Sequence, residues 1–252
     1  MKWTDRLESA VGLTRSLIIY YGQPWRRAAL RRFYGSLIEP GDLVFDIGAH
    51  VGSRSRTLLD IGARVVAAEP QPVFANLLEY WQGGQLQGLE RVAVGGSVGE
   101  VELYVSRLHP TVTSVSSEFV QSVGNTNGFR SVSWDQKLRV PMTTLDVLIT
   151  KYGRPAFCKI DVEGAEGEVL AGLSSTIPLV AFEYIPAMQS VTRASIDMLL
   201  ALGDYEFNRV SGETHLFASE QWMSGQEMIS ELALMSLDDP SGDIYARLKQ
   251  VI

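Results

Sequence analysis

The segment that most constrains this chain is Val44–Gly52 (VFDIGAHVG), an apolar run that passes into a turn with two glycines. The run from Leu43 to Ile47 has the β-branched and aromatic composition of a buried strand. Gly48 and Gly52 allow a sharp turn and a close approach to a ligand. Ser53–Asp60 is predicted to be helical, so the turn ends at a helix N-terminus with free N–H groups. This order predicts a nucleotide-cofactor site at the start of an α/β sheet.

The rest of the chain continues the alternation of strand and helix, which favours a doubly wound, mostly parallel sheet. A half-exposed strand is predicted at Gly99–Ser106, a short strand at Lys137–Met142, and a terminal antiparallel hairpin at Tyr205–Val210 and Thr214–Ala218. The polar stretch from His109 to Trp134 is predicted to be a long loop that is either functional or mobile. The core strands are predicted at Leu43–Ile47, Arg64–Glu69, Leu89–Val94, Phe157–Val162 and Leu179–Tyr184.

Two regions are expected along the chain. Residues 1–40 form an N-terminal helical cap, broken near Gly22-Gln23-Pro24. Residues 41–252 form one α/β domain that ends in an acidic, helical tail. The cap is basic: it carries seven Lys or Arg and three Asp or Glu, although the whole chain has a net charge of −7. That overall charge argues against a nucleic-acid binder.

The basic cluster of the cap has two interpretations. Arg26, Arg27, Arg31 and Arg32 form either the solvated face of an amphipathic helix or a patch for an anionic substrate, carrier or membrane surface. The single cysteine, Cys158, excludes an internal disulfide and a cysteine-cluster metal site. Without an apolar stretch of membrane-spanning length or a signal-peptide pattern, a cytoplasmic protein without integral membrane association is expected. The sequence does not indicate an oligomeric state.

Three acidic features are predicted to meet at one edge of the sheet: Asp46 before the glycine turn, Glu69 after the second strand and Asp161 after the fourth. A carboxylate at the second position suits the hydroxyls of an adenosine ribose. The turn lacks the third glycine of the dinucleotide pattern G-x-G-x-x-G. Carboxylates near the turn suit the ammonium and sulfonium of S-adenosylmethionine (SAM), so SAM is favoured over NAD. Asp46 either faces that cation or braces the loop.

The expected cofactor-binding residues surround the turn and these strand ends. They are Asp46, Gly48, Ala49, His50, Gly52, Glu69, Pro70 and Asp161.

Several segments together resemble the FkbM family of SAM-dependent methyltransferases. Besides Val44–Gly52 they are Ala68–Pro70, Val140–Asp146, Lys159–Glu166 (KIDVEGAE) and Ala181–Tyr184. The resemblance implies a class I, Rossmann-like methyltransferase fold with seven strands, and methylation of a hydroxyl oxygen in polyketide, glycan or related biosynthesis. The sequence departs from the family pattern at His50, where asparagine is usual, and at Arg54 and Arg56, which replace apolar or aromatic residues.

Methyl transfer to an aliphatic hydroxyl calls for a general base or a metal ion. The candidate catalytic residues are Asp161, Glu163, Glu183 and His109, with His50 as a further candidate base. Asp161 has the alternative role of binding the amino-acid end of SAM. Asp161, Glu163 and Glu183 also offer oxygen ligands for Mg²⁺, although no spacing demands a metal.

The leading hypothesis is a SAM-dependent O-methyltransferase that acts on a small or carrier-linked hydroxylated metabolite. Three alternatives remain: an N- or C-methyltransferase of the same fold, an NAD-dependent oxidoreductase, and a non-catalytic SAM-binding module.

Overall fold

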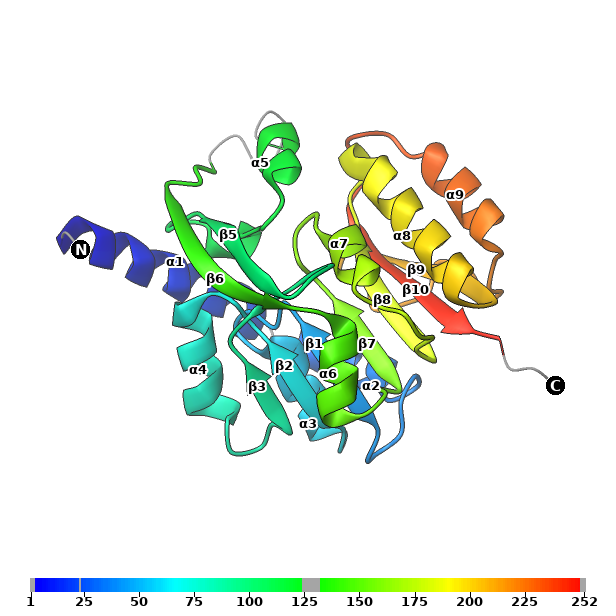
Figure 1. The fold of residues 1–252 in the computed structure, drawn as a ribbon, viewed down its shortest axis with the longest axis horizontal. Coiled ribbons are helices and arrows are strands. Elements are labelled where there is room, and N and C mark those ends of the chain that lie inside the picture. Colours follow the sequence, from blue (N-terminus) through cyan, green and yellow to red (C-terminus); the bar gives the residue numbers. More distant parts are fainter. Residues whose placement is uncertain (1–2, 23, 124–131, 250–252) are drawn as a thin grey trace.

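A seven-stranded mixed sheet forms the centre of the molecule (Figure 1). The structure is a computed structural model that describes residues 3–22, 24–123 and 132–249. The strand order is β3-β2-β1-β7-β8-β10-β9, with parallel pairing from β3 to β8 and antiparallel pairing of β10 with β8 and β9. The strands are β1 (Leu43–Ile47), β2 (Arg64–Ala68), β3 (Gly88–Glu90), β7 (Phe157–Ile160), β8 (Leu179–Tyr184), β9 (Tyr205–Ser211) and β10 (Gly242–Leu248).

This topology confirms the predicted doubly wound sheet of the class I methyltransferase type, with its antiparallel end. Two helices precede the first strand, and the others lie between strands along the chain. They are α1 (Trp3–Tyr21), α2 (Pro24–Tyr34), α3 (Ser53–Asp60), α4 (Pro72–Gln82), α5 (Ser117–Val123), α6 (Leu145–Tyr152), α7 (Glu166–Ala171), α8 (Gln189–Leu202) and α9 (Gly225–Ala233), with 3-10 turns η1 (Pro110–Val112) and η2 (Pro186–Met188).

Helices cover both faces of the sheet, because successive strand residues point to opposite faces. Phe45 and Ile160 belong to the core cluster shared with α6, α7, α8 and α9. Val44 and Phe157 face the other way, into the cluster formed with α2 and α3. Burial of both faces explains why β1 and β7 are almost continuously apolar.

The predicted third strand, Leu89–Val94, is wrong as a single element. Its first part lies in β3 at the edge of the main sheet, whereas Ala93–Val94 (β4) pairs with β6 (Gln136–Thr143) in a second sheet. That three-stranded sheet has the order β4-β6-β5, with β5 spanning Gly99–Val105. The strands predicted at Gly99–Ser106 and Lys137–Met142 are thereby confirmed, and the second sheet brings Val94 and Leu103 next to the carboxyl edge of β1.

The predicted terminal hairpin is also wrong in its second strand. Residues 214–218 contribute only an isolated bridge between Phe217 and Val210. The partner of β9 is instead β10, which comes from the tail predicted to be helical and inserts between β8 and β9. The tail is helical only in α9, after which the alternation of Ile244 and Tyr245 buries one residue on each face.

The polar region predicted as one loop contains short helices. η1 and α5 lie within His109–Trp134, and residues 124–131 of that prediction lie outside the described residues. The helical cap expected near the N-terminus consists of α1 and α2, although residue 23 at its break is not described.

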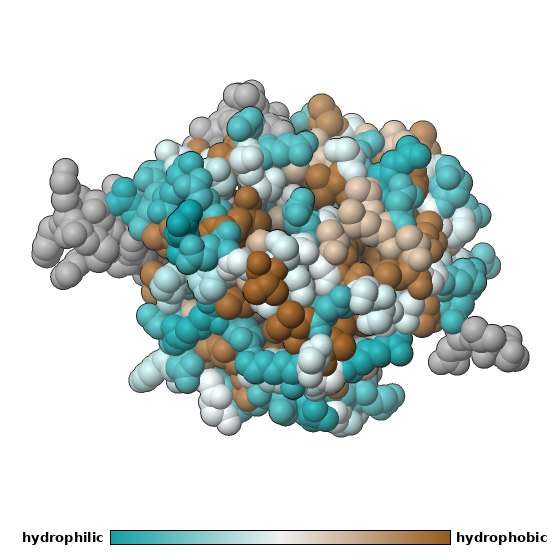
Figure 2. Space-filling model, in the orientation of Figure 1, coloured by the Kyte–Doolittle hydropathy of each residue, from teal (hydrophilic) through white to brown (hydrophobic). Residues whose placement is uncertain are grey.

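The outer surface is mixed in character. Figure 2 shows hydrophobic side chains reaching the surface in small groups among hydrophilic ones. Among the described residues, none of the helices combines the length and the apolar character needed to cross a bilayer.

The insertion of β10 between β8 and β9 predicts that the last strand is essential for stability. Ile244 is 0% exposed in the main core, so Ile244→Ala should lower the free energy of unfolding. The expected loss is about 2–5 kcal/mol in urea unfolding. Leu234→Ala is the control, because Leu234 is 87% exposed and its loss should be within about 0.5 kcal/mol. Equal stability of the two variants would contradict the central position of β10.

Candidate functional site

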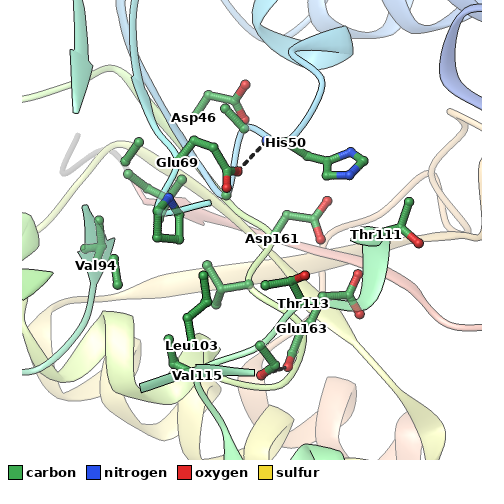
Figure 3. Close-up of a pocket in the computed structure, with 18 of the residues that line it drawn as sticks. Asp46, His50, Glu69, Val94, Leu103, Thr111, Thr113, Val115, Asp161 and Glu163 are labelled. Carbon is green, nitrogen blue, oxygen red and sulfur yellow. Dashed lines mark hydrogen bonds between the residues drawn. The ribbon is translucent and has the colours of Figure 1, made fainter. Parts of the chain in front are cut away.

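A cavity opens at the carboxyl edge of β1, β2 and β7. It contains about 800 Å³ of space, including the part open to solvent, which lies within the size range of small-molecule sites. Figure 3 shows Val94, Leu103 and Val115 on one side of the cavity and Asp161 and Glu163 on another. The cavity therefore has an apolar wall and an acidic wall.

The glycine turn after β1 forms the floor of this cavity. Gly48 has φ 80°, and a Cβ there would lie 1.9 Å from the carbonyl oxygen of Asp161. Gly52 has φ 75°, and a Cβ there would lie 2.4 Å from atoms of Leu78 and Gln82. Both positions thus require glycine for conformation and for space. Gly48 lines the cavity itself, whereas Gly52 packs behind it against α4.

Asp46 lines the cavity and also braces the loop. The alternation along β1 places its carboxylate on the face toward α3, where Oδ2 accepts a hydrogen bond from the hydroxyl of Ser55. Burial raises the pKa of Asp46, and the Ser55 hydroxyl opposes this shift. Of the two roles expected for Asp46, the structure provides a direct contact for bracing.

Glu69 follows β2 and contacts the turn. Its Oε2 accepts a hydrogen bond from the backbone N–H of His50 at 2.8 Å, drawn in Figure 3, and its Oε1 accepts one from Gln71 N–H at 2.8 Å. Burial raises the pKa of Glu69 to about 7, although both N–H groups favour the ionised form. Each carboxylate oxygen has a second acceptor position, so Glu69 can still receive hydroxyl donors from a ligand.

His50 contributes its backbone to this contact and its ring to packing. It has a positive φ of 51°, and its ring lies between Tyr20 of α1 and Phe74 of α4, with centroids 5.3 and 3.8 Å away. Burial lowers the pKa of His50 to about 3, and both ring nitrogens are buried without a hydrogen-bond partner. A neutral, packed ring is a poor general base. Ala49 and Pro70, also predicted for the cofactor, line the cavity nearby.

Asp161, at the end of β7, is surrounded by cations. Lys159 Nζ lies 3.5 Å from Asp161 Oδ2 and 3.1 Å from Asp243 Oδ1, and its side chain is 0% exposed. Arg54 Nη1 lies 3.6 Å from Asp161 Oδ2. Burial alone would raise the pKa of Asp161, but Lys159 and Arg54 outweigh it and hold that pKa below its ordinary value. Asp161 therefore stays ionised and is a weak base.

Glu163 and Glu183 lie beside Asp161 and have the opposite electrostatics. Burial, and then the nearby Asp161, raise the pKa of Glu163 well above its ordinary value. Burial and the neighbouring Glu163 do the same to the pKa of Glu183, whose buried Oε2 has no hydrogen-bond partner among the described residues. Carboxyl groups with raised pKa values are suited to accept protons near neutral pH.

The turn after β7 holds these groups in place. Glu163 has a positive φ of 55°, and Ser114 Oγ donates a 2.6 Å hydrogen bond to its carbonyl oxygen. Glu166 accepts hydrogen bonds from the backbone N–H groups of Val162 and Gly164 at 3.3 and 3.2 Å. Glu163 thus has a left-handed backbone conformation that Ser114 and Glu166 hold through hydrogen bonds on either side of it, and such constrained turns cluster at functional sites.

The three carboxylates Asp161, Glu163 and Glu183 also meet the geometry of a cation site. One oxygen of each lies within 4.8 Å of the other two. Oxygen donors at this spacing fit a divalent ion such as Mg²⁺. The cluster can therefore act through proton transfer or through a bound metal.

His109 is not brought into the cavity. Its Nδ1 lies 3.0 Å from Arg15 Nη1 of α1, and burial together with Arg15 lowers the pKa of His109. Its neighbours Thr111 and Thr113 line the cavity instead.

Several residues of the site carried no assigned role in the sequence analysis. Arg54 and Tyr20 line the cavity, and Lys159 and Asp243 form the buried pair behind it. The alternation of residues 242–248 could have indicated a strand there, with Asp243 near the edge of the sheet where the cavity lies. Tyr20 contacts His50 of the turn, which lies 30 residues further along the chain, and no local sequence pattern predicts a contact between such distant segments.

The charges of the lining argue against a pyrophosphate. Among the described residues, Arg54 is the single Lys or Arg that lines the cavity, whereas four lining side chains are carboxylic: Asp46, Glu69, Asp161 and Glu163. A cofactor with a neutral ribose and a cationic end fits this lining, and one with two phosphates does not.

The pair between Lys159 and Asp243 predicts a large effect on stability. Lys159→Met keeps the apolar stem but removes the buried counter-charge of Asp243 and leaves Asp161 with Arg54 alone, so the free energy of unfolding should fall by about 3–5 kcal/mol. Lys151→Met is the matched control, since Lys151 is 57% exposed in its ion pair with Glu90. Its loss should stay below about 1 kcal/mol. Thermal and urea unfolding measure the stability of both variants. A similar loss in Lys159→Met and Lys151→Met would contradict the importance of the buried ion pair.

The sequence of this chain is similar to a known protein family and to a member of it. Residues 46–237 match the family model described as "Methyltransferase FkbM domain". A 31-O-demethyl-FK506 methyltransferase FkbM from Streptomyces tacrolimicus is 25% identical over 214 residues, which cover 75% of this chain and 81% of that protein.

Solved structures with a similar arrangement were also found. An O-methyltransferase from Bacillus cereus in complex with SAH has a TM-score of 0.47 and 13% identity, covering 99% of this chain and 92% of that chain. The O-methyltransferase TomG from Streptomyces achromogenes, in complex with SAM, has a TM-score of 0.46 and 9% identity, covering 99% and 91%.

The family match spans most of the chain, including the glycine turn, Glu69 and the Asp161–Glu166 segment. It overturns the alternative of an NAD-dependent oxidoreductase. The chain belongs to the FkbM family of SAM-dependent methyltransferases.

Proposed function

We propose that this protein methylates a hydroxyl oxygen of a small or carrier-linked biosynthetic metabolite, of the glycan or polyketide kind. The observation that carries the proposal is the convergence of Asp161, Glu163 and Glu183 beside the cofactor cavity. An aliphatic hydroxyl needs a proton acceptor in order to attack a methyl group. The printed name of the Streptomyces tacrolimicus relative, a 31-O-demethyl-FK506 methyltransferase, supports an oxygen target.

The cavity walls support one orientation of the cofactor. Val94, Leu103 and Val115 would contact the adenine, and Glu69 would accept hydrogen bonds from the ribose hydroxyls. Asp161 and Glu163 on the acidic wall (Figure 3) would then lie at the amino-acid end and the methyl group. When bound, SAM supplies a methyl group activated by a positively charged sulfur.

The electrostatics distinguish the candidate bases. Asp161 is held ionised by two cations and would bind the cofactor ammonium rather than take a proton. Glu183 and Glu163 have raised pKa values, and Glu183 Oε2 has no hydrogen-bond partner. In its ionised form Glu183 would accept the hydroxyl proton as the acceptor oxygen forms its bond to the methyl carbon, with Glu163 sharing the proton. His109 is set aside as a base because it does not line the cavity.

The expected result of removing the base is a loss of turnover with little loss of cofactor binding. Glu183→Gln should lower kcat about 10²–10⁴-fold and change the affinity for S-adenosylhomocysteine (SAH) less than about threefold. The assay is SAH release with a panel of hydroxylated acceptors, with mass spectrometry to identify the methylated atom. His109→Ala is the control and should retain activity.

Two outcomes would change the proposal. Methylation of nitrogen or carbon in the product would replace O-methylation by the alternative chemistry. Full activity in Glu183→Gln together with complete loss on chelation by EDTA would replace proton transfer to Glu183 by a metal-assisted reaction.

Glu69 predicts a pH dependence of cofactor binding. Its pKa of about 7 in the free protein means that it holds a proton at lower pH. Ribose hydroxyls bind the ionised form, so binding must release that proton, and SAH affinity should fall by up to about tenfold per unit as pH decreases below 7. Calorimetry across this range tests it. Glu69→Gln should bind SAH more weakly and with a flatter profile; an unchanged slope in the variant would contradict the role.

A further inference from the structure

Arg54, the second residue of α3, separates the cofactor cavity from a second cavity. The second cavity contains about 650 Å³ of space between α1, α2 and α3, including its open part, and Tyr20, Ser53 and Arg54 line both cavities. The Arg54 side chain is 17% exposed. Its position on the shared wall places a guanidinium at the acidic end of the cofactor cavity.

The guanidinium lies between two carboxylates without a short contact to either. Nη1 is 3.6 Å from Asp161 Oδ2, and Nη2 is 3.4 Å from Glu213 Oε1. Charge-assisted hydrogen bonds between such groups are usually about 2.7–2.9 Å long. The pair of Arg54 with Asp161 is therefore loose, and a ligand that offered each group a closer partner would replace it.

An amino-acid end supplies those partners. It carries one carboxylate and one ammonium, so it matches a guanidinium and a carboxylate side by side, and no net charge is added to the site. We propose that Arg54 binds the carboxylate of SAM while Asp161 binds its ammonium. The loose ion pair between Arg54 and Asp161 in the free protein is then replaced by two closer ion pairs with the ligand. This inference rests on the orientation proposed above, with the ribose at Glu69.

The side chain of Arg54 suits this role better than a lysine would. A planar guanidinium can hold one carboxylate with one edge and a second with the other. Glu213, in the turn after β9, would keep its contact with Nη2 and so position the group, leaving the opposite edge for the ligand. Glu213 is thus a positioning residue, and Arg54 and Asp161 are the cofactor contacts.

The test is calorimetry with SAH and two analogues, one with hydrogen in place of the carboxylate and one with hydrogen in place of the amine. Arg54→Met should weaken SAH about tenfold to hundredfold. It should change the affinity for the analogue without the carboxylate less than about threefold. Asp161→Asn should show the reciprocal pattern with the analogue without the amine. Arg56→Met is the matched control, because Arg56 is exposed on the same helix and should affect none of the ligands.

The two halves of the experiment separate folding from recognition. Binding of the analogue without the carboxylate by Arg54→Met shows that the variant is folded, and Arg54→Lys, which keeps the charge, should retain part of the preference for SAH. Equal weakening of SAH and that analogue by Arg54→Met would overturn the proposal. Failure of Glu69→Gln to weaken SAH would instead overturn the proposed orientation, whatever the result at Arg54.

Discussion

The candidate site depends on one buried cation, Lys159. Its ammonium lies between Asp161 and Asp243, so it joins the end of β7 to β10, a strand more than 80 residues further along the chain. Asp243 stands directly opposite Glu183 in the pairing of β10 with β8, so Lys159 and its partner lie next to the candidate base. Together with Arg54, the lysine keeps Asp161 ionised. The sheet edge can therefore hold several carboxylates in different protonation states.

The difference in protonation state gives neighbouring carboxyl groups different chemistry. Asp161, next to Lys159 and Arg54, is an anion suited to a cationic ligand, whereas burial and the neighbouring charges favour the protonated forms of Glu163 and Glu183. Groups of one type with separated pKa values allow binding and proton transfer at the same edge. The apolar wall from the small β4-β6-β5 sheet completes the cavity on its other side.

The local parts of this arrangement were predictable from the sequence. The glycine turn, Glu69 and Asp161 lie at strand ends, and parallel topology alone places them at one edge. The rest depended on distant contacts. Asp243 lies in a strand that resembled an acidic tail, and Leu89–Val94 had the composition of one strand although its residues divide between two sheets. Periodicity predicts burial but not the partner that provides it, so only the fold shows that Arg54 lines the cavity and that His109 does not.

The central claim is that the carboxyl edge of β1, β2 and β7 binds SAM with its ribose at Glu69 and its sulfur toward Asp161, Glu163 and Glu183. A crystal structure of the protein with SAH bound tests this most directly. We expect the ribose hydroxyls within hydrogen-bond distance of Glu69, the adenine against Val94 and Leu103, and the sulfur next to the three carboxylates. Adenine at the acidic wall, or SAH bound outside this cavity, would contradict it.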